Sequence, residues 1–434
     1  MLLSLTVENW RCFKKRVRLD LTASRERTGS ETLARLSSMY GTRKVLPLAA
    51  LYGANGSGKT GLIDALDFMR HMVVDGVAVD RPIPIEPYRL DPEVKDQPAS
   101  FEVEILVDDR VYTYGFSATR RYIVEEHLQV QRTRSHDNIF FRSRQRWHFG
   151  SRYKTDRNTF VAEGTRQNQL FLCNAISQNV NELKPIYDWF ARSLQMVGIE
   201  AQYGSYHVML LRDDFREFVN DCLRRLGPGI SRLLLKDVPR ESLGIPQDLL
   251  EDYLHLVTED DARFAQLQVN WPGGSDIYII DTDGDEPTFQ KVQLAHTSTG
   301  GNEVAFDLSE ESMGTQRLVK LLPMFFELAS PDSTTKVYVV DELDRSFHTA
   351  LTQNLITLFL ASCSRDTRKQ LLFTTHDLLL MRHERIRRDE QWIAENRVNE
   401  GSSIICIGTH KDVRTDTSLL KAYMSNALGG YPAF

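Results

Sequence analysis

The feature that most constrains the fold is the glycine-rich octapeptide GANGSGKT at residues 53–60. An apolar run at residues 45–52 leads into it, and GLIDALDFMRHMV, with apolar residues at helical spacing, follows it. Strand, glycine-rich loop and helix in this order predict a P-loop, whose backbone N–H groups face phosphate oxygens. We expect Lys59 to meet the β and γ phosphates of a nucleotide and Thr60 to ligate Mg²⁺. The residues expected to bind the nucleotide here are Gly53, Ala54, Asn55, Gly56, Ser57, Gly58, Lys59 and Thr60.

A second motif, KVYVVDE at residues 336–342, is an apolar strand that ends in two carboxylates, the form of a Walker B element. We expect Asp341 to hold Mg²⁺ through its water shell and Glu342 to polarise the attacking water as a general base. An apolar strand ending in Asp-Glu is common on its own. Together with the P-loop, it indicates hydrolysis of a nucleoside triphosphate, with Lys59, Glu342 and a histidine as the catalytic set.

That histidine is His376, which directly follows the strand expected at residues 371–374, where a polar group can sense the γ-phosphate. The same position also suits an ordinary hydrogen-bonded surface residue. Upstream of the Walker B strand, Ser312 and Gly314 stand at the start of the helix expected at residues 312–329. They present a hydroxyl and bare N–H groups to an anion, although on local grounds they could be a helix cap alone.

The remaining pattern predicts an α/β protein whose nucleotide-binding domain is assembled from both ends of the chain. Residues 100–107, 111–117 and 123–131 alternate like paired strands and form a β-rich wing, whereas residues 168–267 show helical periodicity. Buried strands at 336–340 and 370–374, separated by a helix, fit a parallel sheet. We therefore expect residues 1–167 to carry the P-loop and the wing, 168–267 to be a helical insertion, and 268–434 to complete the ATPase domain.

The composition and charge of the chain restrict what it is expected to bind and where in the cell it is expected to act. The net charge of −6 argues against a uniformly basic nucleic-acid surface, and no stretch has the unbroken apolar length of a membrane span. The amino terminus alternates like a strand and lacks the features of a signal peptide, so a cytoplasmic protein without membrane contact is expected. The cysteines are scattered singly, without metal-ligand spacing, and are expected to be reduced: Cys12, Cys173, Cys222, Cys363 and Cys406.

The ordered motifs resemble those of the ABC-type ATPases of the OLD, RecF and SMC group, and more narrowly the OLD-like, AAA-family ATPases of the AbiLi or PARIS antiphage type. The stretches that carry this resemblance are VENWRCFKKRVRLDL, NQLFLCNAISQN, ESMGTQR, VDELDRSFH, FTTHD, RRDEQWIAE and KAYMSNALGGYP. The resemblance implies an ABC-type, RecF-like fold, ATP and Mg²⁺ as cofactors, and a head-to-tail dimer or higher homo-oligomer. In that dimer, Ser312 and Gly314 would grip the γ-phosphate bound by the other subunit.

Some features depart from the family pattern. We expect no TOPRIM domain in this chain, so any effector nuclease, TOPRIM or RloB-like, would be a separate polypeptide. No Q-loop glutamine can be placed, since Gln97 lies in a Pro-flanked loop that does not settle its role. There is also no long heptad run that would form SMC-type arms.

Three functions are compatible with these patterns. The first is a regulatory ATPase of an antiphage, abortive-infection system, which controls an effector nuclease and responds to a phage trigger protein. The second is a RecF-like DNA-binding ATPase in repair, supported by the arginines and aromatic residues interleaved along residues 132–157, which also fit a two-faced strand with a solvated side. The third is a scaffold in which ATP only holds an assembly together, against which the general base Glu342 argues.

Overall fold

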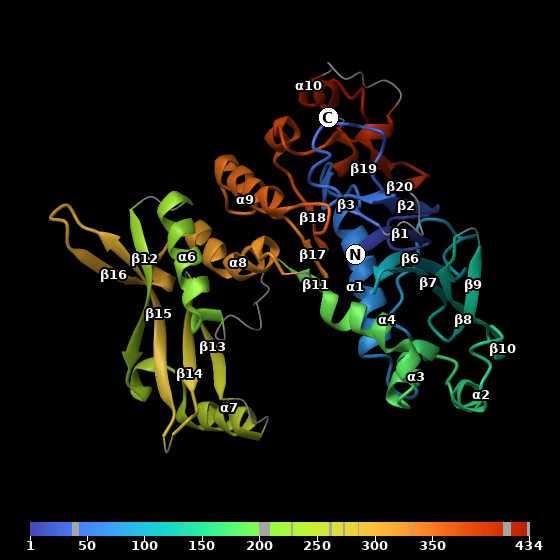
Figure 1. Ribbon diagram of the computed structural model, residues 1–434, viewed down its shortest axis with the longest axis horizontal. Helices are drawn as coiled ribbons and strands as arrows, with labels where there is room; N and C mark the ends of the chain where they lie inside the picture. The colour runs from blue at the N-terminus through green and yellow to red at the C-terminus, as the bar shows by residue number, and fades with distance from the viewer. Residues whose placement is uncertain are drawn as a thin grey trace. The chain divides into compact units, whose positions relative to one another are not determined.

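The computed structural model describes residues 1–36, 43–133, 135–198, 209–226, 229–259, 263–271, 274–284, 286–332, 334–410 and 418–431. The chain divides into two compact units. The first comprises Met1–Ile199, Pro331–Asp344 and Phe359–Phe434, and the second comprises Glu200–Ser330 and Arg345–Leu358. The first unit therefore joins the two ends of the chain (Figure 1).

A six-stranded sheet forms the centre of the first unit. Its order is β11 (Leu194–Val197), β17 (Lys336–Val340), β18 (Lys369–Thr374), β5 (Leu48–Tyr52), β19 (Gln391–Arg397) and β20 (Gly401–Cys406). All neighbouring pairs are parallel except β19 and β20, which are antiparallel. The middle strands β5 and β18 are fully buried and mostly apolar, as is typical of a parallel sheet.

The predicted β-rich wing is a seven-stranded antiparallel sheet. Its order is β10 (Arg146–Phe149), β9 (His136–Ser143), β8 (Ile123–Gln131), β7 (Arg110–Ala118), β6 (Ala99–Val107), β1 (Leu2–Glu8) and β2 (Val17–Asp20). A small pair, β3 (Ala34–Arg35) and β4 (Lys44–Val45), stands apart from both sheets. The amino-terminal strand thus belongs to the wing and not to the P-loop sheet.

Helix α1 (Lys59–Val74) ties the two sheets together (Figure 1). Its buried face shares one hydrophobic core with residues of the wing and of the parallel sheet. Phe68 packs against Trp10 and Phe101, each at 5.0 Å between ring centroids. Trp10 Nε1 also donates to the Gly61 carbonyl at 3.0 Å. These contacts hold the turn after β1 beside the first turn of α1.

The outer end of the wing is fastened to a group of short helices, α2 (Asp156–Glu163), α3 (Phe171–Ser177), α4 (Lys184–Asp188) and the π-helix η3 (Trp189–Ser193). Glu126 of β8, fully buried, accepts from the backbone N–H groups of Phe171 and Leu172 at 2.6 and 3.1 Å. A carboxylate at a helix N-terminus satisfies free N–H groups and meets the positive end of the helix dipole. Arg142, equally buried, lies 3.7 Å from Glu126 and donates to the carbonyl groups of nearby loops.

The second unit is built on a five-stranded antiparallel sheet. Its path is β12 (Ile230–Val238), β15 (Thr288–Thr297), β14 (Gly274–Asp281) and β13 (Phe264–Trp271), and β16 (Glu303–Asp307) also pairs with β15. The helices of this unit are α6 (Asp213–Leu226), α7 (Gln247–Glu259) and α8 (Met313–Ala329). Helix α7 packs Leu250 and Val257 against the apolar face of the sheet.

The structure corrects the helical character predicted for residues 168–267. Helices α6 and α7 are present, but β11, β12 and β13 also fall in this range, and residues 168–198 lie in the first unit. The breaker predicted at residues 227–229 lies mostly outside the described residues. An α/β P-loop class with a β-rich wing is confirmed, and a purely helical insertion is wrong.

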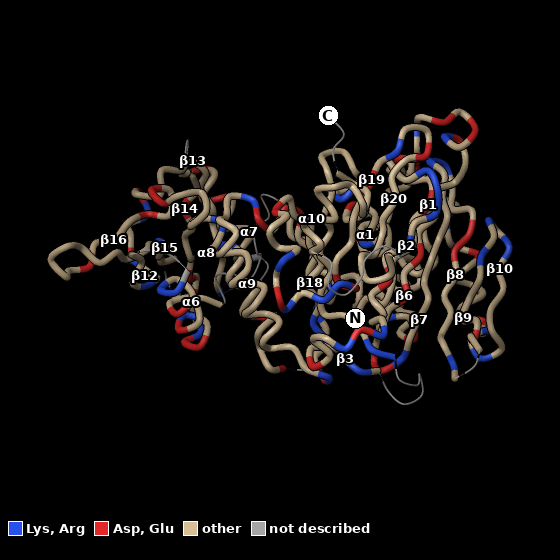
Figure 2. Tube along the Cα trace, turned by 90° about the horizontal axis from the view of Figure 1, so that it is seen from above, with Lys and Arg blue, Asp and Glu red and all other residues tan. Residues whose placement is uncertain are grey.

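The remaining elements are short or connect the units. Helix α9 (Thr349–Ser362) begins in the second unit and ends in the first, and α10 (Leu419–Met424) lies near the carboxyl end. The 3₁₀ turns are η2 (Asn181–Leu183), η4 (Arg240–Leu243), η5 (Leu308–Glu310), η6 (Leu378–Arg382), η7 (Arg388–Glu390) and η8 (Ile407–Thr409). Among the described helices, none has the length and apolarity needed to cross a membrane. Figure 2 shows acidic and basic residues interspersed along the trace of both units.

Candidate nucleotide-binding site

The site lies where three parallel strands of the first unit end. Strands β5, β18 and β17 are neighbours, with Thr374 opposite Leu51 and Phe373 opposite Val340. Because parallel strands present their carboxyl ends at one edge of the sheet, the P-loop, the Walker B carboxylates and the segment with His376 leave the sheet together. The strand order therefore brings together three motifs that lie far apart in the sequence.

The backbone of the P-loop requires glycine at two of its positions. Gly53 and Gly58 have φ values of 150° and 110°, where residues with a side chain are strained. A Cβ at Gly53 would lie 2.4 Å from the Ala394 carbonyl oxygen, and one at Gly58 would lie 2.9 Å from Ser402 Oγ. The loop is therefore pressed against β19 and β20, and this contact fixes the direction in which its N–H groups point.

Lys59 is folded back onto the loop. It is 6% exposed, and Nζ donates to the carbonyl oxygens of Gly53 at 2.7 Å and Ala54 at 3.2 Å. Burial lowers the pKa of Lys59, and the carboxylates of Asp341, Glu342 and Asp344 act in the opposite direction. A bound phosphate would replace these carbonyl oxygens as the partner of Nζ. Its negative charge would stabilise the charged ammonium group, which burial disfavours.

Asp341 is held by hydroxyl groups on two sides. Thr374 Oγ1 donates to Asp341 Oδ1 at 2.6 Å, and Thr60 Oγ1 lies 3.1 Å from Asp341 Oδ2. Hydroxyl and carboxylate oxygens are ligands that Mg²⁺ accepts. Among the described residues, no three His, Cys, Asp or Glu side chains cluster closely enough to hold a metal. The Thr60 hydroxyl and the Asp341 carboxylate fit the oxygen ligands that Mg²⁺ prefers.

Glu342 and His376 face the same space. Glu342 has φ 51°, and its backbone N–H donates to Thr374 Oγ1 at 2.7 Å. The Glu342 Oε1 atom lies 3.8 Å from the ring nitrogen Nε2 of His376. The backbone N–H of His376 donates to Asp344 Oδ2 at 3.2 Å. A non-glycine residue at this φ is a strained arrangement that neighbouring contacts must maintain.

A single cavity of about 480 Å³ joins these groups. The structure thus brings together Lys59, Thr60, Asp341, Glu342 and His376, and four other P-loop residues, Asn55 to Gly58, line the same cavity. The cavity is lined by a phosphate-binding loop, by the paired Thr60 hydroxyl and Asp341 carboxylate, and by the Glu342 carboxylate beside His376. These are the groups that hydrolysis of a nucleotide requires.

Ser312 and Gly314 lie in the second unit, at the start of α8. Ser312 Oγ caps this helix by accepting from the Thr315 N–H at 3.2 Å. A Cβ at Gly314 would lie 2.7 Å from the Ser346 carbonyl oxygen, so the close approach of the chain after Asp344 requires a glycine there. Both residues thus have a local structural role, whatever else they bind.

The cavity also contains residues that the motifs did not identify, Arg11, Cys12, Asp64 and Thr374. Arg11 has φ 47° in the turn after β1, forms an ion pair with Asp64 and lies 3.3 Å from Glu86. Only the fold reveals these residues, because a lone arginine or threonine has no characteristic spacing. The available signals were the quoted stretches VENWRCFKKRVRLDL, which contains Arg11 and Cys12, and FTTHD, which contains Thr374.

Gln97, considered for a Q-loop, lines a separate cavity at the end of the wing. The arginine-rich strip proposed for DNA is largely engaged in internal contacts. Arg142 is fully buried, Arg132 Nε donates to Asp137 at 2.7 Å, and Arg157 donates to the Gln178 carbonyl at 2.7 Å. Arg134 lies outside the described residues. Part of the strip therefore belongs to internal contacts of the first unit, whereas Arg146 and Arg152 are exposed.

A protein-family model described as "AAA domain, putative AbiEii toxin, Type IV TA system" matches residues 48–166 and 180–382. These ranges make up most of the chain and include the P-loop, the Walker B strand and His376. The chain belongs to this AAA family. Membership supports an ATPase of the AAA/ABC type, whose P-loop fold implies nucleotide binding, and leaves the narrower OLD-like, AbiLi and PARIS types undistinguished.

Two solved structures similar to this AAA-family chain are SMC heads. One is the SMC head domain from Thermotoga maritima, with 14% identity, a TM-score of 0.39, and coverage of 94% of this chain and 98% of that chain. The other is an SmcHead bound to the C-winged helix domain of ScpA, with 14% identity, a TM-score of 0.40, and coverage of 93% and 97%. No curated protein matches the chain. The family assignment rests on the family match alone.

Proposed function

We propose that this AAA-family protein hydrolyses ATP at the cavity described above and uses the cycle to control a separate effector. The observation that carries the proposal is the convergence of Lys59, Thr60, Asp341, Glu342 and His376 on one cavity. A site that only bound nucleotide would not need a carboxylate in the position of Glu342.

The residues divide the work between binding and proton transfer. Lys59 would exchange the carbonyl oxygens of Gly53 and Ala54 for phosphate oxygens, and Thr60 and Asp341 would hold Mg²⁺. The bound Mg²⁺ supplies charge that offsets the negative charge of the phosphates. Glu342 accepts a proton from the attacking water, and His376, 3.8 Å away, orients that carboxylate and contacts the γ-phosphate.

A second copy of the chain completes the site in this proposal. Ser312 is exposed at the N-terminus of the 17-residue helix α8, where a free N–H group and the helix dipole favour an anion. Ser312 and Gly314 of one copy would then contact the γ-phosphate held by the P-loop of the other. ATP binding would join two copies head to tail, and hydrolysis would release them.

The biological role we propose is the regulatory subunit of an OLD-like antiphage system of the AbiLi or PARIS type. The family description names a putative toxin of a toxin–antitoxin system, which supports a role alongside a second protein. The effector would be a separate nuclease, TOPRIM or RloB-like, and a phage protein would be the trigger. Deletion of the neighbouring genes should abolish protection in phage plating, and full protection by this chain alone would disprove the regulatory role.

The biochemical test compares wild type with Lys59→Ala and Glu342→Gln. Lys59→Ala should lose ATP binding, whereas Glu342→Gln should bind ATP, lose about 10²–10⁴-fold in turnover, and accumulate as a larger species in sedimentation. Glu163→Gln, at the exposed end of α2, is the matched control and should behave as wild type. Unchanged turnover in Glu342→Gln would rule out the proposed general base.

A further inference from the structure

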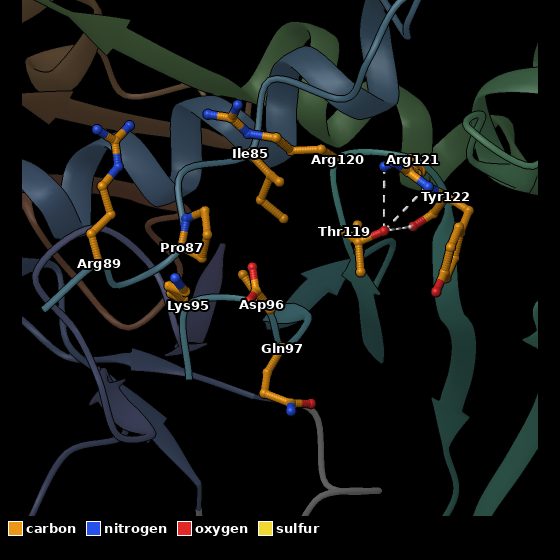
Figure 3. Close-up of a pocket in the computed structure, with 12 residues that line it drawn as sticks. Ile85, Pro87, Arg89, Lys95, Asp96, Gln97, Thr119, Arg120, Arg121 and Tyr122 are labelled. Atoms are coloured by element: carbon orange, nitrogen blue, oxygen red, sulfur yellow. Dashed lines mark hydrogen bonds between the residues drawn. The ribbon is translucent and has the colours of Figure 1, made fainter. Parts of the chain in front are cut away.

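A second cavity, of about 500 Å³, lies at the end of the wing. Its floor includes Ala99 and Ala118, which pair across β6 and β7. One wall is the loop at residues 85–97 and the other is the turn at residues 119–122. Figure 3 shows the loop residues Pro87, Arg89 and Lys95 on one side of the opening and Thr119, Arg121 and Tyr122 on the other.

The cavity is rimmed by cations that the protein itself does not neutralise. Arg89, Lys95, Arg120 and Arg121 are all exposed, and among the described residues none of them forms an ion pair. Asp96 is the single acidic side chain among the described lining residues. In a chain with a net charge of −6, such an excess of positive charge around one hollow attracts anions.

Two acidic residues of the loop form ion pairs with cations that do not line the cavity. Glu86 lies 3.3 Å from Arg11, and Asp91 lies 2.5 Å from Lys14. On the opposite wall, Arg144 stacks over the Tyr122 ring at 5.0 Å and donates to its hydroxyl at 3.4 Å. This contact places a further cation beside the turn at residues 119–122 and fixes the ring at the cavity wall.

The same loop is tied to the nucleotide site. Asn9, which is 2% exposed, donates to the carbonyl oxygens of Val94 at 2.9 Å and Gln97 at 2.8 Å, and accepts from the Tyr88 N–H at 3.1 Å. The Arg11 N–H donates to the Glu86 carbonyl at 2.7 Å. Because Arg11 lines the P-loop cavity, a shift of the loop at residues 85–97 would move Arg11 and alter that cavity.

We propose that the wing cavity is a second anion site that binds a compact polyphosphate and that its occupancy changes turnover at the P-loop. Phosphate groups are the ligands that several converging, unpaired Arg and Lys side chains bind best. The size and concave form suit a nucleotide-sized ligand, whereas a nucleic-acid strand needs cations spread along a groove. The effect on turnover rests on the proposed ATPase function, but the binding does not.

Binding at the wing cavity is tested in a variant whose P-loop is impaired in nucleotide binding. In a Lys59→Ala background, isothermal titration calorimetry with inorganic tripolyphosphate should show a site that Arg120→Gln/Arg121→Gln weakens at least tenfold, about 1.4 kcal/mol. Arg89→Gln/Lys95→Gln, from the opposite wall, should do the same. The matched control is Arg146→Gln/Arg152→Gln, which removes two exposed, unpaired wing arginines outside the cavity and should leave the affinity unchanged. Thermal melts check that each variant is folded.

The outcomes separate the possible ligands. Equal affinity in the cavity variants and the control variant would overturn the proposal. Single-stranded oligonucleotides that bind through the same arginines more tightly than tripolyphosphate, with affinity rising with length, would also overturn it, because the ligand would then be nucleic acid. At saturating ATP, tripolyphosphate should change wild-type turnover at least twofold but leave Arg120→Gln/Arg121→Gln unaffected; no change in wild type would refute the coupling.

Discussion

Thr374 offers the sharpest test of the way in which the Walker B carboxylates are held. Its hydroxyl, in a fully buried side chain, donates to Asp341 Oδ1 at 2.6 Å and accepts from the Glu342 N–H at 2.7 Å. Thr374→Val keeps the shape and removes both bonds. The hydrogen bond to a carboxylate contributes about 1.5–3 kcal/mol, and the unsatisfied N–H costs about 1–3 kcal/mol. Since such terms overlap, we expect the free energy of unfolding to fall by about 2–4 kcal/mol.

The variant should also alter the metal dependence. An outer partner that orients a metal ligand changes metal affinity about 10–100-fold, so half-maximal turnover should need at least tenfold more Mg²⁺. Thr374→Ser keeps the hydroxyl and should recover most of both losses. Urea denaturation gives the stability, and a Mg²⁺ titration of ATP turnover gives the affinity.

The matched control is Thr6→Val in β1. Thr6 is 4% exposed and its hydroxyl has no hydrogen-bond partner in the part of the chain that the structure describes, so loss of that hydroxyl should be neutral or stabilising. If Thr374→Val were as stable as Thr6→Val and needed no more Mg²⁺ than wild type, the hydroxyl would not be positioning Asp341, and the proposed metal site would be wrong.

Three further outcomes are expected. Gly58→Ala should lose ATP affinity and about 1–3 kcal/mol of stability, because its φ is 110° and the Cβ would crowd Ser402, whereas Gly56→Ala, with open space around it, should lose less in both assays. Burial raises the pKa of Cys12, so iodoacetamide should label this thiol slowly at pH 7 and faster as the pH rises, and ATP should slow the labelling in mass spectrometry, since Cys12 lines the cavity. Although burial opposes it, hydrogen bonds from Gln293 and Lys291 lower the pKa of Asp307. The ionised carboxylate therefore stabilises the fold fully above the pKa of the unfolded chain, near 3.8, and this stabilisation is lost as the pH falls through the lower pKa of the folded protein. Asp307→Asn should flatten this part of the pH dependence of stability in urea denaturation.

The elements around the P-loop could be predicted because their patterns are strong. Strand β8 begins and ends at the predicted residues, and α1 follows the glycine-rich loop as expected. Long alternating or buried runs leave one solution, and the P-loop dictates a strand before it and a helix after it. The same motifs also supplied the five residues that meet in the cavity.

The second unit shows where such patterns fail. Strand β12 contains the run Leu233, Leu234 and Leu235, which fits a helix as well as a strand, and only its pairing with β15 decides the matter. Strand β11 is only four residues long, and its parallel pairing with β17 decides that this segment is a strand. The roles of Arg11 and Thr374 were equally hidden, because they depend on which strand ends lie next to each other.

The strand order has a consequence for synthesis on the ribosome. Strand β5 lies between β18 and β19, which are made roughly 320 residues later, a delay of about 15–60 s at ordinary elongation rates. Until then both edges of β5 lack their partners, and its apolar residues are open to aggregation. A truncated chain that ends before β18 would therefore carry an intact P-loop sequence without a folded nucleotide site, so nascent chains should depend on chaperones until the carboxyl-terminal strands emerge.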